Sequence, residues 1–108
     1  MLTDWVVAFV FTQLFELPLY WRATKGRLWV GFLASTFTHP VVWFVFPLLM
    51  QVGVEYWPMV AAAEVFAVLA EAAWLKVMRV ERPLLWSLAA NGCSFTLGMV
   101  MRELVGFP

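Results

Sequence analysis

Four long apolar stretches, separated by short segments that carry most of the charge, constrain this chain more than any other feature. In the 108 residues they lie at about residues 5–21, 29–50, 57–75 and 84–101. Each is close to the roughly 20 residues that an α-helix needs to cross a bilayer. Lipid offers no hydrogen-bond partners, so each backbone N–H and C=O group in a span must pair within a helix or a closed barrel. The two-residue alternation typical of barrel strands is absent, so the stretches are predicted to be helices. We therefore predict one all-α membrane domain over residues 1–108, an up-down-up-down antiparallel bundle of four transmembrane helices.

The composition agrees with this fold class and excludes several others. Hydrophobic residues make up 64% of the chain and charged residues 13%, whereas soluble domains average about 45–50% and about 25%. Seven Lys and Arg balance seven Asp and Glu, so we expect no nucleic-acid partner. The single cysteine, Cys93, forms no internal disulfide or zinc finger. Four spans leave no room for a soluble catalytic domain, so we expect any activity to take place in the bilayer.

Basic residues predict the orientation of the bundle. Six of the seven lie in or beside the loops between the first and second spans and between the third and fourth: Arg22, Lys25, Arg27, Lys76, Arg79 and Arg82. By the positive-inside rule, these loops face the cytoplasm and both termini face outward. Aromatic residues are predicted to form an inner belt of Tyr20, Trp21, Trp29, Trp74 and Trp86 and an outer belt of Trp5, Tyr56 and Trp57.

Four ionisable residues lie inside the predicted spans, namely Glu16, His39, Glu64 and Glu71. A charge at the centre of a membrane helix costs at least about 2.5–3.5 kcal/mol, and such residues usually face a protein interior or a water-filled cavity. Counted along straight helices, Glu16 and Glu71 lie roughly 7–9 Å from the inner boundary, and His39 and Glu64 roughly 18 Å. We predict that these four residues bind an ion or a proton.

Other polar residues repeat at helical spacing on the same faces and predict a shared cavity in the cytoplasmic half of the bundle. The supporting polar residues are predicted to be Gln13, Ser35, Thr36, Asn91 and Ser94. Pro40 and Pro18 cannot donate a backbone hydrogen bond, so we expect kinks beside His39 and Glu16. Pro40 would leave the carbonyl group of Thr36 without its helical donor.

Two kinds of chemistry beyond ion or proton binding fit these residues. Three carboxylates and one imidazole, from Glu16, His39, Glu64 and Glu71, suit Mn, Fe or Zn, and would make the chain an intramembrane enzyme acting on a lipid or peptide. A Ser35–His39 pair oriented by Glu64 would instead support nucleophilic catalysis. Neither alternative has a recognisable catalytic motif, so the sequence leans away from an enzyme.

A third alternative is a non-catalytic membrane subunit or assembly factor. Polar groups inside a membrane bundle hydrogen-bond across helices and hold their register without doing any chemistry. In this interpretation, the polar faces of the four helices are purely structural.

Length, short loops and a glutamate in the first span make the chain similar to the small multidrug resistance transporters. That resemblance implies proton exchange at Glu16. A second set of residues resembles a group of small bacterial membrane proteins with a Thr-Asn-Pro or Thr-His-Pro second helix: Thr38, His39, Pro40, Glu64, Glu71, Ser87, Asn91, Ser94 and Gly98. This second resemblance implies a location in the bacterial inner membrane.

The interpretation that the sequence favours is a small ion- or proton-coupled membrane protein. Glu64 and His39 are predicted to form the site at the membrane midplane, and Glu16 and Glu71 its approach from the cytoplasm. Because four short helices make a narrow bundle, we also expect a homodimer or a membrane partner protein.

Overall fold

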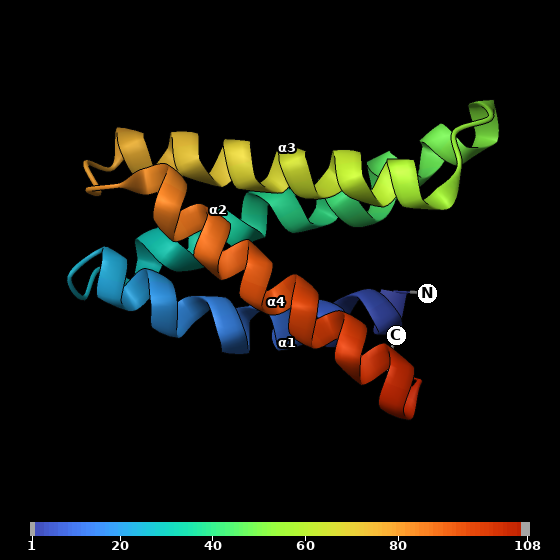
Figure 1. Ribbon diagram of the computed structural model, residues 1–108. Coiled ribbons are helices and arrows are strands. Elements are labelled where there is room, and N and C mark those ends of the chain that lie inside the picture. Colours follow the sequence, from blue (N-terminus) through green and yellow to red (C-terminus); the bar gives the residue numbers. More distant parts are fainter. Residues whose placement is uncertain (1, 107–108) are drawn as a thin grey trace.

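The structure, a computed structural model, describes residues 2–106 and consists of helices joined by short loops (Figure 1). The elements in chain order are α1 (Leu2–Ala23), α2 (Leu28–Pro40), the π-turn η1 (Val41–Val45), the 3-10 helix η2 (Phe46–Val52), α3 (Tyr56–Val77) and α4 (Pro83–Val105). No strand occurs in these residues. Four helical segments are long and apolar enough to cross a membrane, the second running from Leu28 to Val52. The predicted all-α bundle of four transmembrane helices is thereby confirmed.

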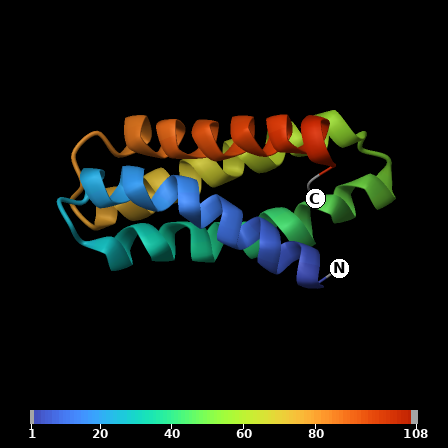
Figure 2. The same ribbon diagram turned by 90° about the horizontal axis from the view of Figure 1, so that it is seen from below.

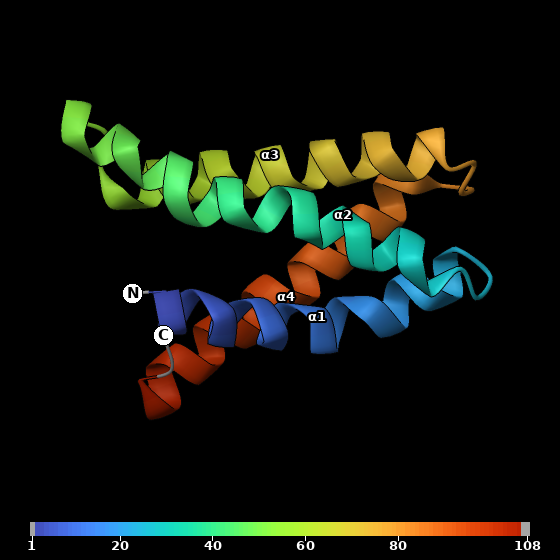
Figure 3. The ribbon, with the colours of Figure 1, turned by 180° about the vertical axis from the view of Figure 1, so that it is seen from behind.

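Successive helices run antiparallel, so the first and third interhelical loops lie at the same end of the bundle. The loops of residues 24–27 and 78–82 lie together at one end, which we term the basic end (Figure 1). Both chain ends and the loop of residues 53–55 lie at the other, which we term the terminal end (Figure 3). α1 packs against α2 and α4 (Figure 2). α4 is close to α3 at the basic end and crosses the bundle diagonally, diverging from α3 toward the terminal end (Figure 1).

The two loops of the basic end close tightly through local hydrogen bonds. In the first loop, the Thr24 hydroxyl donates to the carbonyl oxygens of Tyr20 at 2.7 Å and Arg27 at 3.1 Å. Gly26 adopts a φ of +93° and donates its N–H to the Trp21 carbonyl at 2.9 Å, a helix ending that glycine favours. Arg27 then joins the two loops, because its guanidinium donates to the Met78 carbonyl at 2.8 Å.

The second span changes its helical pattern in the middle of the membrane. α2 ends at Pro40, and the π-turn η1 follows directly, as expected where a proline removes a backbone donor. Residues 41–52 are therefore π- and 3-10-helical and not α-helical, whereas the sequence predicted a kinked helix as far as residue 50. The 3-10 helix ends at Gly53, whose φ of +100° places it in the left-handed region.

Burial in this bundle is opposite to that of a soluble protein. Among residues 2–106, eight polar or charged residues are buried, while large apolar side chains such as Leu14, Phe37 and Leu69 are more than half exposed. In water such a surface would be unstable, whereas in a bilayer it faces lipid and the polar groups pair inside. The apolar core is a small cluster of Tyr20, Val30, Ala34, Leu75, Val80 and Ala90. The structure therefore describes an integral membrane protein.

α1 and α2 approach each other most closely where Gly31 faces Tyr20. A Cβ atom built on Gly31 would lie 2.5 Å from the Tyr20 Cβ atom, which is a steric overlap. Glycine is therefore required at this position by packing, as is common where membrane helices cross closely.

We expect Gly31→Ala to destabilise the protein by about 1–3 kcal/mol, the usual cost of overpacking. Gly92→Ala is the matched control, because a Cβ atom there meets nothing within 4 Å and alanine favours the helix by up to about 1 kcal/mol. Thermal unfolding in detergent measures both. Equal melting temperatures for the two variants would contradict the close approach of α1 and α2.

Candidate functional site

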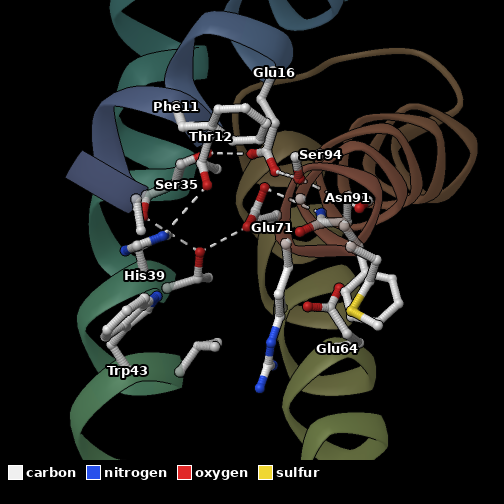
Figure 4. A pocket seen from close by; sticks show the side chains of 18 of the residues that line it. Phe11, Thr12, Glu16, Ser35, His39, Trp43, Glu64, Glu71, Asn91 and Ser94 are labelled. Carbon is white, nitrogen blue, oxygen red and sulfur yellow. Dashed lines mark hydrogen bonds between the residues drawn. The ribbon is translucent and has the colours of Figure 1, made fainter. Parts of the chain in front are cut away.

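A cavity of about 310 Å³ lies between the four helices, and polar side chains surround it. All four ionisable residues predicted from the sequence line it: Glu16, His39, Glu64 and Glu71. Three of the predicted supporting residues, Ser35, Asn91 and Ser94, also line it. Figure 4 shows the carboxyl groups of Glu16 and Glu71 at the centre, between side chains from α2 and from α4.

Glu71 is 2% exposed and accepts hydrogen bonds from the three other helices. The Tyr20 hydroxyl of α1 donates to Oε1 at 2.6 Å, and the Thr38 hydroxyl of α2 donates to Oε2 at 2.6 Å. The Asn91 amide of α4 donates to Oε1 at 3.3 Å. Both carboxyl oxygens therefore have partners, and every partner is neutral.

Glu16 forms a second centre of the same kind. It is 2% exposed, the Ser35 hydroxyl donates to its Oε1, and the Ser94 hydroxyl donates to its Oε2 at 2.5 Å. Its carboxyl group lies within electrostatic reach of Glu71 and Glu64. Glu16 and Glu71 together hydrogen-bond all four helices to one another.

Glu64 differs from the other two glutamates, since its side chain is only half-buried and has no hydrogen-bond partner among residues 2–106. It lies on α3 and lines the cavity together with Asn91 and Phe95 of α4. Of the three carboxyl groups in the cavity, Glu64 therefore has the one that is free to take up a ligand without breaking an existing hydrogen bond.

His39 lies against α1, surrounded mainly by aromatic rings. Its Nε2 atom is 3.4 Å from the Thr12 hydroxyl, and its ring centroid lies 5.4 Å from that of Phe9 and 6.1 Å from that of Trp5. Its Nδ1 atom is buried and has no partner within the described residues. Because Ser35 donates to Glu16 instead, the predicted catalytic pair of Ser35 and His39 is not formed.

The structure shows no ready-made metal centre in the part of the chain that it describes. No three His, Cys, Asp or Glu side chains within residues 2–106 are grouped so that they could hold a metal ion. The possible binding of Mn, Fe or Zn by Glu16, His39, Glu64 and Glu71 therefore stays a prediction. These residues line one cavity, but their hydrogen bonds direct them to different partners around it.

The lining of the cavity extends from the buried carboxyl groups toward the terminal end. Toward the basic end, the fully buried Tyr20 and Leu75 pack in the apolar core cluster, which stands between Glu71 and the loops. Toward the terminal end, the lining continues to Tyr56 and Arg102, which are exposed or half-buried. Glu16 and Glu71 therefore lie at the buried end of the lining, next to the apolar core cluster.

Tyr56 and Arg102 form the rim of the cavity at the terminal end. The Arg102 guanidinium donates to the Tyr56 hydroxyl at 2.6 Å and lies 5.6 Å from the centre of its ring. A cation and an aromatic face at this distance attract each other. The pair bridges the first turn of α3 and the last turns of α4, where the two helices have diverged.

Two predicted supporting residues lie away from the cavity lining. The Gln13 amide donates to the Phe32 carbonyl at 3.4 Å, and the Thr36 hydroxyl donates to the same carbonyl at 2.7 Å. The Thr36 hydroxyl makes a local bond within α2, as threonine often does in helices.

Three residues around the site were given no role in it by the sequence. Tyr20 was predicted to lie in the inner aromatic belt and on the same helical stripe as Glu16, and it is fully buried with its hydroxyl on Glu71. Thr38 was noted only beside His39, although it donates to Glu71. Arg102 was noted only as the basic residue outside the cytoplasmic loops.

Comparison of the chain with models of protein families, with curated proteins and with solved structures finds no match. The two family resemblances in the sequence therefore stay predictions. The function is inferred from the chemistry of the cavity.

We expect Thr38→Val to destabilise the bundle by about 1–3 kcal/mol, because it removes one donor from a buried carboxyl group. Thr36→Val makes the same chemical change on the same helix but removes only a local bond, so we expect its effect to stay within about 0.5 kcal/mol. Thermal unfolding in detergent compares them. A Thr38→Val variant as stable as Thr36→Val would show that the Thr38–Glu71 bond contributes nothing.

Proposed function

We propose that this chain is a small membrane protein that binds and exchanges protons or a monovalent cation at Glu64, as part of a coupled transport cycle. The observation that carries the proposal is the unpartnered carboxyl group of Glu64 in a cavity that also holds Glu16 and Glu71. Ionised carboxylates that share a cavity of low dielectric repel one another, and a bound proton or cation removes part of that repulsion.

In this proposal, Glu16 and Glu71 stabilise the bundle and Glu64 exchanges the proton or cation. Glu16 and Glu71 already accept hydrogen bonds from neutral donors at both oxygens, so displacing those donors would disrupt contacts between helices. Glu64 has no such donor, and taking up a proton or cation there leaves the contacts of the bundle intact. His39, on the opposite wall of the cavity, is proposed to line the path of the ion or proton, not to bind it directly.

Location and assembly belong to the same proposal. With the basic loops on the cytoplasmic side, in a bacterial inner membrane, the rim at Tyr56 and Arg102 faces outward. The apolar core cluster at the basic end then closes the cytoplasmic side, so a complete cycle needs a second conformation. We propose that a second copy of the chain or a membrane partner supplies the surface against which the narrow bundle moves.

One observation favours a second candidate, a non-catalytic subunit whose polar interior is structural. The donors on Glu16 and Glu71 satisfy both carboxyl groups, as expected of interhelical hydrogen bonds whose role is assembly. In this alternative, Glu64 is an unused polar residue and its replacement changes no measurable flux.

Substitution of Glu64 separates the two candidates. For Glu64→Gln we expect proton or monovalent-cation flux into proteoliposomes to fall at least tenfold, with the melting temperature unchanged, because the amide keeps the shape and cannot ionise. For Glu71→Gln we expect a lower melting temperature, because an amide group cannot accept at both positions. Flux is measured with a pH-sensitive dye trapped in the vesicles and with radioactive Na⁺ or Rb⁺.

Glu55→Gln is the matched control, since Glu55 is exposed in the loop of residues 53–55 and does not line the cavity. It should retain the flux and the stability of the wild-type protein. Wild-type flux in Glu64→Gln would contradict the proposed exchange site and support the structural alternative.

A further inference from the structure

A second hollow lies between α3 and α4, beside the polar cavity. This α3–α4 groove has a volume of about 550 Å³. Its walls are mostly apolar and include Trp57, Val60, Val68, Leu69 and Leu88. The groove follows from the divergence of α3 and α4 toward the terminal end (Figure 1).

Three residues belong to both the groove and the cavity, namely Glu64, Asn91 and Phe95. The half-buried Glu64 therefore stands at the junction of a polar space inside the bundle and an apolar space open to the bilayer. A ligand that occupies both spaces needs a polar head and an apolar chain. In a membrane, lipids have this shape and approach from the side.

The charged side chains near Glu64 indicate which kind of lipid head group would fit. Glu64 is an acid without a partner at the junction, and Arg102 is a cation at the rim of the cavity. A purely cationic amphiphile would leave Arg102 without an anionic partner, and a purely anionic one would place its charge beside Glu64. A zwitterionic head, with an ammonium group and a phosphate group, complements both charges.

We propose, on the basis of the proposed function, that the ligand of this site is a zwitterionic aminophospholipid that enters laterally from the bilayer. Its phosphate pairs with Arg102 at the rim, its ammonium group pairs with Glu64, and one alkyl chain lies in the α3–α4 groove. Trp57 lies at the terminal end of the groove and Leu69 and Leu88 lie deeper along α3 and α4, so the chain runs parallel to the lipids around it.

Native mass spectrometry of the purified protein in mixed micelles tests the ligand class. The probe is dioleoyl phosphatidylethanolamine, and its comparators are dioleoyl phosphatidylglycerol, which has the same chains and an anionic head, and dodecylamine, which lacks the phosphate. We expect phosphatidylethanolamine to bind at least tenfold more tightly than either comparator. Equal binding of phosphatidylethanolamine and phosphatidylglycerol, or tighter binding of dodecylamine, would overturn the proposal.

Substitutions test the two halves of the site separately. We expect Glu64→Gln and Arg102→Gln each to weaken phosphatidylethanolamine binding at least tenfold. Glu64→Gln should also reduce the preference of the protein for phosphatidylethanolamine over phosphatidylglycerol. Arg102→Gln should reduce its preference for phosphatidylethanolamine over dodecylamine. Gly92→Leu fills the groove, because Gly92 lines the groove but not the cavity and has open space at its Cβ position. We expect this variant to weaken binding to the same extent.

Ala89→Leu is the control for Gly92→Leu, since Ala89 is exposed on α4 and lines neither hollow. It should bind phosphatidylethanolamine like the wild-type protein, and melting temperatures of both variants verify that they fold. If Gly92→Leu folds and binds as tightly as Ala89→Leu, the groove does not hold the chain and the proposal fails.

Proton or cation flux measured in vesicles of phosphatidylcholine alone tests the proposed function without phosphatidylethanolamine present. Glu64-dependent flux without binding of phosphatidylethanolamine leaves proton or cation exchange standing and removes the lipid ligand. Glu64-dependent binding of phosphatidylethanolamine without any flux supports the ligand and removes the coupled exchange.

Discussion

The arrangement of the whole bundle depends on how two buried carboxyl groups are satisfied. In lipid, apolar side chains gain little by leaving the bilayer for a neighbouring helix, so packing and hydrogen bonds decide how helices associate. Glu71 draws a donor from each of the other three helices, and Glu16 draws donors from α2 and α4. An unpaired carboxyl group in this setting costs several kcal/mol. The rotation of each helix about its own axis is therefore set by the need to present a donor to one of these two groups.

The hollows of the molecule follow from the same arrangement. Small residues and Tyr20 let the helices pack closely at the basic end, and α4 then crosses the bundle at an angle (Figure 1). That crossing brings Ser94 to Glu16 while it opens both the central cavity and the α3–α4 groove toward the terminal end.

The sequence was sufficient to predict the number of spans, their antiparallel order and most of the polar side chains around the cavity, because hydropathy and helical spacing determine these features. It was not sufficient to predict where α4 crosses. Counting along straight helices puts Ser94 at the depth of His39, whereas the diagonal path of α4 places it on Glu16. The partner of Tyr20 could not be predicted for a related reason, since an aromatic residue near the end of a span has the same pattern whether its hydroxyl meets the headgroups or a buried acid. The hydrogen-bond partners of the glutamates could not be predicted either, because residues at a similar depth can pair with any of several neighbouring donors.

The contact between Arg27 and Met78 joins the two helical hairpins of the bundle. The Arg27 guanidinium fastens the α1–α2 loop to the α3–α4 loop, and the apolar core cluster lies directly beside that link. The two helical hairpins are thus joined at their loops, while within the second hairpin α3 and α4 diverge toward the terminal end (Figure 1). There the hydrogen bond from Arg102 to Tyr56 connects α4 to α3 again. Each end of the bundle is therefore held by one arginine side chain, Arg27 at the basic end and Arg102 at the terminal end.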